Sequence, residues 1–255
     1  MNFILVSNRL IKIFSIFIKA FGYIFHFIFP NKRFLIPLSA KPLLPSKNEQ
    51  KIPKILWQTN YTNVVSLPMY INYLFNRLMS YDYEYRYASD ELILKFFTEH
   101  TSKEELEAYT KLNDGAAKAD YWRVVVLHHI GGVYLDIDAT FVWPLSKQIK
   151  PDEEEIFLLN KQHYTNYFMA TAPNNKIFAK AMQLILNNIN SKKTEGGVYA
   201  LTGPEVINIA IDKEDVNNRF YRYVCVQGAF TNEYFHYIDK RNGKWTHTKE
   251  EDILK

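Results

Sequence analysis

Two aspartates, Asp136 and Asp138, stand one residue apart at the end of an apolar run in the stretch GGVYLDIDAT (131–140). On a strand over 132–138, alternate side chains point to opposite faces, so both carboxylates project on the same side. Neighbouring carboxylates repel each other, and Mg²⁺ or Mn²⁺ relieves this repulsion while also binding substrate phosphates. A turn in which Asp138 caps the next segment explains the pair without a metal. The spacing alone leaves both interpretations open.

A second polar pair precedes the aspartates. The sequence predicts a helix over 113–130, in which Asp120 and Arg123 are three residues apart and share one face. Gly131-Gly132 ends this helix and lets the chain turn directly into the strand, which brings the pair back toward the two aspartates. An ordinary surface ion pair, worth about a few tenths of a kcal/mol, is the alternative.

Strands and helices alternate around these residues from Ile52 onward. Apolar periodicity and turn residues predict strands over 52–59, 83–89, 132–138, 155–160 and 167–172. The same signals predict helices over 66–80, 90–111 (two short ones), 113–130, 173–190 and 204–211. This order predicts an α/β fold with a largely parallel sheet and a ligand crevice at the carboxyl ends of the strands.

Composition limits the class of protein. A chain of 255 residues, 47% hydrophobic, is expected to fold around one large core. The net charge of +4, with no long run of like charge in the middle of the chain, gives no reason to expect nucleic acid as a partner. The single cysteine, Cys225, excludes an internal disulfide framework and is expected to be a buried strand residue.

The first 29 residues are the most apolar part of the chain, and no acidic residue precedes Glu49. In a helix, one narrow polar stripe would collect Asn8, Lys12, Ser15, Lys19, Gly22 and His26. This pattern favours an amphipathic helix in the membrane plane, with its lysines at anionic headgroups, over a spanning signal anchor.

The expected organisation is a membrane-associating helix over 1–29, a proline-rich linker over 30–51 and a catalytic domain over 52–255. Removal of residues 1–29 is then expected to release the protein from membranes and leave hydrolysis of a soluble donor nearly intact.

One stretch resembles a known family. KADYWRVVVLHHIGGVYLDIDATF is similar to the glycosyltransferases with a DXD-type sugar-binding region, family 32, and to the matching stretch of the large glucosylating toxins. IPKILWQT (52–59) resembles the opening strand of that family, and LTGPEVI (201–207) resembles its later Thr-Gly-Pro segment. In HYIDKRNGKW (236–245), Lys244 replaces the serine that relatives commonly show before the tryptophan, which leaves the third protein ligand of the metal unassigned.

The resemblance implies a GT-A fold, with a mixed Rossmann-like sheet flanked by helices, and sugar transfer from a nucleotide sugar with retention. It implies that Asp138 binds Mn²⁺ or Mg²⁺ directly and that Asp136 contacts the ribose or reaches the metal through water. Asp120 and Arg123 would hold the donor sugar, and Arg123 would also draw charge from the diphosphate. Asp136, Asp138 and Arg123 are therefore the expected catalytic residues.

Four further residues are candidates for the site. Trp57 could stack on the donor base, although an aromatic residue on a strand is a core residue as often. Trp245 could cover the diphosphate, with packing as the equal alternative. His236 or His247 could complete the metal site, whereas a lone histidine more commonly has a surface or hydrogen-bonding role.

The resulting expectation is a metal-dependent retaining glycosyltransferase. It would use a UDP- or GDP-sugar and a glycan or lipid-linked acceptor in capsule or lipopolysaccharide synthesis. It would lie at the cytoplasmic face of a bacterial inner membrane, with a Golgi-type lumenal enzyme on a signal anchor as the alternative location.

Two rival functions stay open at this point. Asp136, Asp138 and Thr140 also fit the motif of haloacid-dehalogenase-type phosphohydrolases, in which the first aspartate attacks phosphorus. A membrane-docked sugar-binding module without catalysis is the other. Release of nucleoside diphosphate, release of phosphate and binding without turnover distinguish the three.

Overall fold

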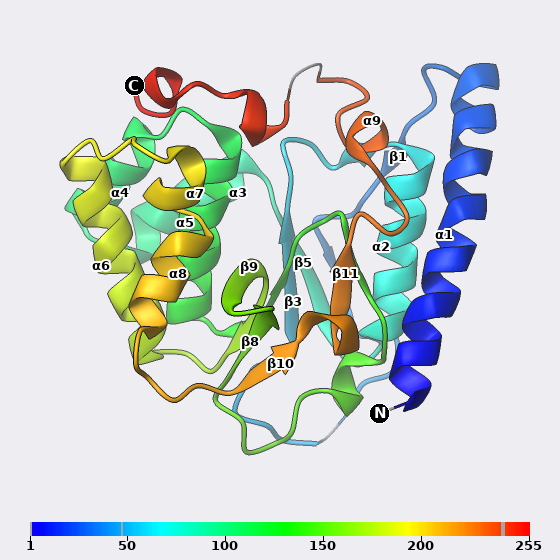
Figure 1. The fold of residues 1–255 in the computed structure, drawn as a ribbon, viewed down its shortest axis with the longest axis horizontal. Helices are drawn as coiled ribbons and strands as arrows, with labels where there is room; N and C mark the ends of the chain where they lie inside the picture. The colour runs from blue at the N-terminus through cyan, green and yellow to red at the C-terminus, as the bar shows by residue number, and fades with distance from the viewer. Residues whose placement is uncertain (1, 47, 241–242) are drawn as a thin grey trace.

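The computed structural model describes residues 2–46, 48–240 and 243–255. Within them, a seven-stranded sheet has the order β10-β8-β9-β6-β3-β5-β2 (Figure 1). Its strands are β2 (Ser39–Ala40), β3 (Ile55–Thr59), β5 (Glu84–Ala88), β6 (Gly132–Leu135), β8 (Glu155–Asn160), β9 (His163–Thr171) and β10 (Asn218–Phe220). The predicted mixed α/β architecture is confirmed.

The sheet is less parallel than expected. β6, β3 and β5 run parallel, but β9 is antiparallel to both β6 and β8. β2 also pairs antiparallel with β5. Three of the six strand pairings in the described part of the sheet are therefore antiparallel. β8 and β9 are joined by a two-residue turn at Lys161 (φ 57°), and such a short connection can join only antiparallel strands.

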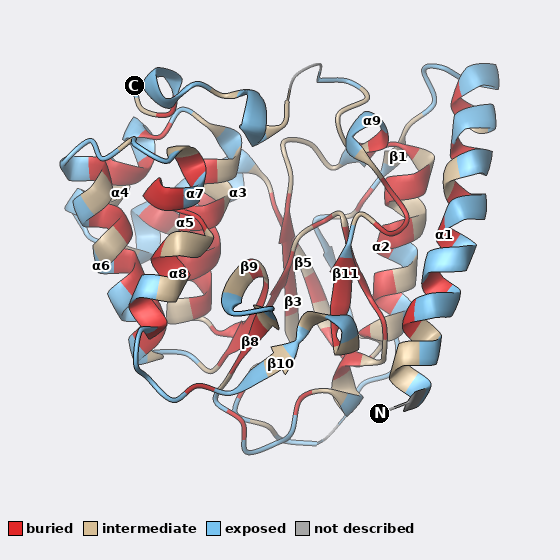
Figure 2. Cartoon of the chain, in the orientation of Figure 1, coloured by how far each residue is buried: buried red, intermediate tan, exposed pale blue. Residues whose placement is uncertain are grey.

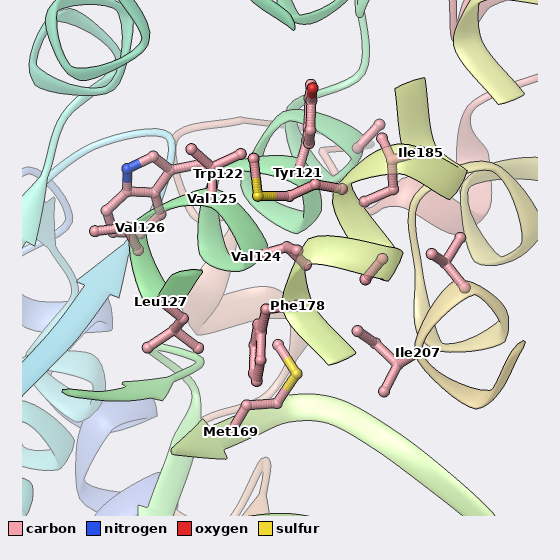
Figure 3. Close-up of a cluster of buried hydrophobic side chains, with 14 of the residues drawn as sticks. Tyr121, Trp122, Val124, Val125, Val126, Leu127, Met169, Phe178, Ile185 and Ile207 are labelled. Atoms are coloured by element: carbon pink, nitrogen blue, oxygen red, sulfur yellow. The ribbon is translucent and has the colours of Figure 1, made fainter. Parts of the chain in front are cut away.

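Helices cover both faces of the sheet, as Figure 1 shows. They are α2 (Leu67–Met79), α3 (Asp90–His100), α4 (Lys103–Lys111), α5 (Gly115–His129), α6 (Lys176–Asn190), α7 (Gly197–Leu201) and α8 (Pro204–Ile211). Helices α3 to α8 share one core with the sheet, in which Trp122, Phe178 and Ile207 are buried (Figure 3). α2 packs with Met69 and Tyr73 in a second core on the other face.

Both ends of α5 are determined by the sequence. The Asp114 carboxylate accepts hydrogen bonds from the backbone N–H groups of Ala116 and Ala117 and so caps the start of the helix. At the other end, Gly131 and Gly132 have φ values of 75° and 107°. A Cβ on Gly132 would lie 2.8 Å from the carbonyl oxygen of Ile55, so this turn requires glycine.

Substitution of Gly132 with alanine is expected to lower the free energy of unfolding by roughly 1–3 kcal/mol, because the positive φ strains the backbone and the methyl group meets β3. Urea unfolding measures this loss. Gly115→Ala is the matched control, because a Cβ there has no neighbour within 4 Å. An equal loss of stability in both variants would contradict the assignment of strain to Gly132.

A small second sheet follows the aspartates. β7 (Ala139–Phe141) pairs antiparallel with β11 (Cys225–Gln227), and Cys225 is a buried strand residue, as predicted. The chain then forms the short helix α9 (Glu233–His236) and a 3-10 turn at Trp245–His247. These short elements were not predicted.

Helix α1 (Asn2–Ile28) packs along the domain beside α2, with its polar stripe turned inward. Asn8, Ser15 and His26 are buried, and the backbone N–H of Leu67 donates to His26 Nε2 at 3.1 Å. Most of its large apolar side chains face outward, and Figure 2 shows a largely exposed helix. Of the stripe, Lys12 is exposed and Lys19 is partly exposed, so the lysines expected at the headgroups stay accessible while the other members face the domain.

The segment predicted as a linker packs against the domain. Within its described residues, β1 (Phe34–Leu35) pairs with β4 (Val64–Val65), and β2 forms an edge of the main sheet. Ile36, between them, is fully buried. Short strands of two residues carry no periodicity that a sequence could show, because strand alternation needs several residues.

Candidate active site

A cleft of about 900 Å³ opens where β3 and β6 end, which is the predicted place for a ligand in an α/β sheet. Its walls include the end of β3, helix α5, the turn after β6, strand β9 and the segment after β11. The candidate residues among its lining are Asp120, Arg123, Asp136, Asp138, His236 and Trp245. Six of the eight candidate residues named from the sequence therefore line one cleft.

The two aspartates lie on a turn. β6 ends at Leu135, and the backbone N–H of Ala139 donates to the carbonyl of Asp136 at 2.9 Å. The predicted strand over 132–138 is thus three residues too long. Ile137 still packs in the α2-side core, whereas both aspartates face the cleft. Both carboxylates do face the same cleft, but a turn places them there instead of the predicted strand.

Two buried asparagines on α2 hold this turn. Asn72 Nδ2 donates to the carbonyls of Ile137 (2.8 Å) and Ala139 (2.9 Å), and Asn76 Nδ2 donates to Ala139 (2.8 Å). Asn72 Oδ1 accepts from the Thr140 hydroxyl at 2.6 Å. Because these amides satisfy the carbonyls of the turn, they fix the backbone that carries both aspartates.

Arg123 connects the helix to the turn. Its Nη2 lies 3.1 Å from Asp120 Oδ1 and 3.2 Å from Asp136 Oδ1. Nη1 donates to the carbonyl of Asn166 at 2.7 Å, and the guanidinium lies 4.3 Å from the centroid of the Tyr134 ring. Most of its donors are thus engaged by the protein, so Arg123 orients the two carboxylates as well as lining the cleft.

Asp120 is buried, and each of its carboxylate oxygens has a partner. Asn166 Nδ2 donates to Oδ1 at 2.9 Å, and the Thr202 hydroxyl donates to Oδ2 at 3.3 Å. Burial raises the pKa of Asp120 to about 6, and the Arg123 guanidinium opposes that shift. These contacts leave its carboxylate fixed in orientation at the wall of the cleft.

The paired aspartates are electrostatically unfavourable as they stand. Burial raises the pKa of Asp136 to about 6; Arg123 opposes the shift and the Asp138 carboxylate adds to it. Burial also raises the pKa of Asp138. Gln227 Nε2 lies 3.3 Å from Asp136 Oδ2 and 3.3 Å from Asp138 Oδ1, and so bridges the pair. A cation between them would remove the repulsion that the protein only partly offsets.

His236 presents an unprotonated ring nitrogen to the same place. Asn60 Nδ2 donates to the carbonyl of Thr62, so Asn60 Oδ1 accepts from His236 Nε2 at 3.0 Å. This pattern assigns the ring proton to Nε2 and leaves a lone pair on Nδ1, 4.0 Å from Asp138 Oδ2. Burial lowers the pKa of His236 to about 4, which keeps the imidazole neutral. Histidine ligands to metals typically donate a hydrogen bond from the ring nitrogen that does not bind the metal, as Nε2 of His236 does to Asn60.

These donors fit a hard divalent cation. In the described residues, no group of three or more His, Cys, Asp or Glu is already clustered as a metal site. Mg²⁺ and Mn²⁺ do not need a closed protein cage, because one or two carboxylates, water and substrate phosphates complete their shell. Asp136 and Asp138 supply the carboxylates, and His236 is placed to add a nitrogen.

Trp57 does not lie at this cleft. It is buried, its indole N–H donates to the carbonyl of Gly131 at 2.9 Å, and its ring packs edge-on against Trp122. The indole therefore fixes the turn between α5 and β6. The expectation that Trp57 stacks on the donor base is not supported.

The C-terminal candidates lie at the rim. Trp245 lines the cleft and is 40% exposed, which leaves its ring free to cover a ligand. Lys244, at the position where relatives show serine, pairs with Glu233 at 3.0 Å and also lines the cleft. His247 pairs with the same glutamate and lies outside the lining. Arg241 and Asn242, in the same stretch, lie outside the described residues.

Several residues of the site were missed from the sequence. Asn72, Asn76, Asn166 and Gln227 are isolated amides in apolar segments, where spacing alone gives no function. The i,i+4 placement of Asn72 and Asn76 on the buried face of a helix was the one usable signal, because buried amides need partners. Thr202 lies in LTGPEVI, which was singled out without a role for this hydroxyl.

Comparison with known proteins identifies the central part of the chain. Residues 68–157 match the family described as "Glycosyltransferase sugar-binding region containing DXD motif". This stretch is similar to the sugar-binding region of glycosyltransferases with a DXD motif. The match runs from α2 to β8, and so includes Asn72, Asp120, Arg123 and both aspartates of the turn. No curated protein matches the chain.

Among solved structures, the "PaToxG Glycosyltransferase" superposes with a TM-score of 0.54 at 18% identity, over 82% of this chain and 80% of that one. This likeness shows the fold of a glycosyltransferase. The glycosyltransferase domain from the YGT toxin, ligand-free and UDP-bound, gives TM-scores of 0.43 at 14% and 13% identity. The chain spans 54% of the length of that domain. Family match and fold together support a transferase enzyme.

Proposed function

We propose that the protein is a metal-dependent, retaining glycosyltransferase of the family 32 type. It moves a sugar from a UDP- or GDP-sugar to a glycan or glycolipid acceptor in surface polysaccharide synthesis, as in capsule or lipopolysaccharide. The observation that carries the proposal is the convergence of Asp136, Asp138 and the Nδ1 of His236 in the cleft, with both aspartates inside the stretch that matches the sugar-binding region. A cation that binds a diphosphate needs carboxylates held in fixed positions, and the asparagines of α2 fix the turn that carries these two.

The chain's own groups define the chemistry at this point. A bound Mn²⁺ or Mg²⁺ would neutralise the charge that develops on the leaving diphosphate. Asp138 and His236 would hold it, and Asp136, kept in place by Arg123 and Tyr134, would orient it or the ribose. Gln227 would have to release its bridge between the carboxylates, which at 3.3 Å to each is long for a hydrogen bond and easily given up.

Asp120 is the group proposed to hold the donor sugar. Its position is fixed by Arg123, Asn166 and Thr202, so a hydroxyl of the sugar would meet an oriented carboxylate. Arg123 acts mainly through Asp120 and Asp136, since its donors are occupied. The nucleotide would lie toward Asn60 and Tyr61, with Trp245 over the opening.

The acceptor is proposed to approach along Tyr199. This tyrosine lines the cleft and also a second groove, of about 760 Å³, formed by His163, Lys180, Glu205, Asn208, Ile209 and Asp212. An exposed aromatic face beside carboxylate, amide and imidazole groups suits a sugar ring, which offers both apolar C–H faces and hydroxyls.

Tyr199→Ala is expected to raise the KM for the acceptor roughly tenfold or more while changing the KM for the donor less, because the lost stacking face is on the acceptor side. Tyr199→Phe keeps the ring and is the matched variant. Steady-state transfer kinetics with each substrate varied in turn give both constants. A larger effect on the donor KM would contradict this placement.

The membrane is the second proposed partner, at the cytoplasmic face of a bacterial inner membrane. The outward side of α1 exposes large apolar side chains: Phe3, Val6, Leu10, Ile13, Phe14, Ile16, Phe17, Phe21, Ile24, Phe27 and Ile28. A patch of this length is far more than a soluble monomer usually exposes. Arg9, Lys12 and Lys32 are exposed beside it and suit anionic headgroups. The docked helix therefore favours in-plane binding over a spanning anchor.

The experiment is a screen of UDP- and GDP-sugars for hydrolysis that requires Mn²⁺, with phosphate release from sugar phosphates as the parallel assay. Nucleoside diphosphate from one donor class is expected. Phosphate release without it would favour the phosphohydrolase, which the glycosyltransferase fold does not support. Cosedimentation with vesicles of phosphatidylethanolamine and phosphatidylglycerol tests membrane binding, and a protein that stays in solution would contradict it.

A further inference from the structure

Helix α1 also supports one wall of the active site. We propose that Gly22, Tyr23 and Arg33 are positioning residues for the donor site, because they hold the segment 226–240, here called the wall segment, against the cleft. Membrane binding through the outer face of α1 would then leave this support of the proposed metal site in place. This inference rests on the proposed function for the identity of the ligand, but its structural part can be tested separately.

The wall segment carries groups that touch the metal-binding carboxylates. Gln227 bridges Asp136 and Asp138, and His236 Nδ1 lies 4.0 Å from Asp138. The backbone N–H of Gly228 also donates to the carbonyl of Asp138 at 2.9 Å. A shift of this segment would therefore move both a candidate metal ligand and the amide that bridges the carboxylates.

The first half of the wall segment packs on the middle of α1. Ile11 and Ile18 of the helix share a small buried core with Val226, Ala229 and Phe230. Phe14 adds an edge-on contact to the Phe230 ring, at 6.2 Å between centroids. Helix α1 supplies two of the six buried side chains of this core, and Val142 and the partly buried Phe75 also pack in it.

The second half packs on the end of α1, where Gly22 allows close approach. A Cβ at Gly22 would overlap the Pro68 ring and lie 3.1 Å from Phe235 of α9. The next residue, Tyr23, accepts a hydrogen bond from Asn232 Nδ2 at 2.8 Å and stacks on Tyr234 at 5.4 Å between centroids. The turn of α1 at these two residues thus contacts the residues on both sides of Glu233.

A third link follows the helix. Arg33 donates from Nε and Nη2 to the two carboxylate oxygens of Asp239, at 2.6 and 2.7 Å. The Arg33 side chain is 14% exposed, and its paired, planar contact restricts orientation more than a single ion pair does. Contacts at Phe230, Asn232 and Asp239 therefore hold the wall segment on both sides of His236.

The two faces of α1 make different contacts in this arrangement. One face holds the wall segment, and the other is free for lipid, so binding in the membrane plane preserves every contact described above. A helix that left the domain to span the bilayer would uncover Asn8, Ser15 and His26 and would remove the support of His236. The earlier expectation that loss of residues 1–29 spares donor hydrolysis conflicts with these contacts.

Gly22→Leu in the full chain tests the proposal, with Ala20→Leu as the matched control, because Ala20 is exposed on the same helix. Hydrogen–deuterium exchange reports on the wall segment, and electron paramagnetic resonance titration with Mn²⁺ alone reports on the carboxylates. For Gly22→Leu we expect faster exchange over 228–240 and a loss of Mn²⁺ affinity of roughly tenfold or more. Ala20→Leu should change neither. Equal behaviour of the two variants would overturn the proposal.

Two further measurements keep the outcome clear. Tyr23→Phe removes only the hydroxyl that binds Asn232, so it should speed exchange near α9 even if Gly22→Leu fails to fold; unchanged exchange there counts against the proposal. Vesicles of phosphatidylethanolamine and phosphatidylglycerol should leave the wild-type wall segment protected, and faster exchange on their addition would overturn it. A wild-type protein that binds no Mn²⁺ would refute the proposed function. The hydrogen–deuterium exchange data would still test whether α1 supports the wall segment.

Discussion

Asp138→Asn is expected to abolish metal-dependent sugar transfer, with a loss of roughly 10²–10³-fold or more, because one direct oxygen ligand loses its charge. The change removes neither volume nor hydrogen-bonding capacity, and Gln227 can still approach the side chain. The fold should therefore survive. Donor hydrolysis measured across a range of Mn²⁺ concentrations tests the prediction.

Asp215→Asn is the control for that substitution, because Asp215 is exposed and remote from the lining of the cleft. It should keep wild-type turnover and metal dependence. Full activity of wild-type protein in excess chelator, or an Asp138→Asn variant that keeps its response to Mn²⁺, would refute the role given to this carboxylate.

Arg123→Met is expected to have the largest effect on stability. It removes the guanidinium that lies between the buried Asp120 and the largely buried Asp136. Breaking a buried ion pair on one side costs about 3–5 kcal/mol, since it leaves uncompensated charge. Urea unfolding at neutral pH measures the loss, and donor hydrolysis should fall with it because Asp136 loses its orientation.

The double variant Arg123→Met with Asp120→Asn should recover part of that stability, because one of the two uncompensated carboxylates is gone. Arg222→Met, at an exposed guanidinium, should change the free energy of unfolding by no more than about 0.5 kcal/mol. Equal losses for Arg123→Met and Arg222→Met would contradict the described network.

The α5–β6 unit could be predicted from the sequence because its signals are local. Asp114 caps the helix, the glycine pair ends it, and alternation along β6 sends Tyr134 to the side opposite Val133, with the aspartates on the turn that follows. The three-residue spacing of Asp120 and Arg123 then brought both to the cleft. Such features depend on neighbours within a few residues, which is the range over which sequence patterns are informative.

The rest depended on contacts between distant segments. Asn72 holds a turn 65 and 67 residues away, and Asn60 sets the tautomer of a histidine 176 residues away. Trp57 stood next to a recognisable strand, but whether its ring faced the cleft or the core depended on Trp122 and Gly131. The spacing of these residues along the sequence does not indicate which distant residues they contact.

Helix α1 shows the same limit. Its periodicity correctly identified a stripe of small and polar residues, but a stripe does not say which surface it meets. In the structure, Ser15 and Gly22 permit close packing on the domain, and Asn8 donates to the carbonyl of Arg222 at 2.8 Å. Polar residues with partners inside the protein were therefore turned inward, and the apolar face stayed outside.

The most direct test is a crystal structure with Mn²⁺ and a nucleoside diphosphate, UDP or GDP, in which anomalous scattering locates the manganese. The account predicts one manganese peak within bonding distance of Asp138, with His236 Nδ1 or Asp136 beside it and diphosphate oxygens completing its shell. A nucleotide bound elsewhere, or in the cleft with manganese away from these carboxylates, would contradict it.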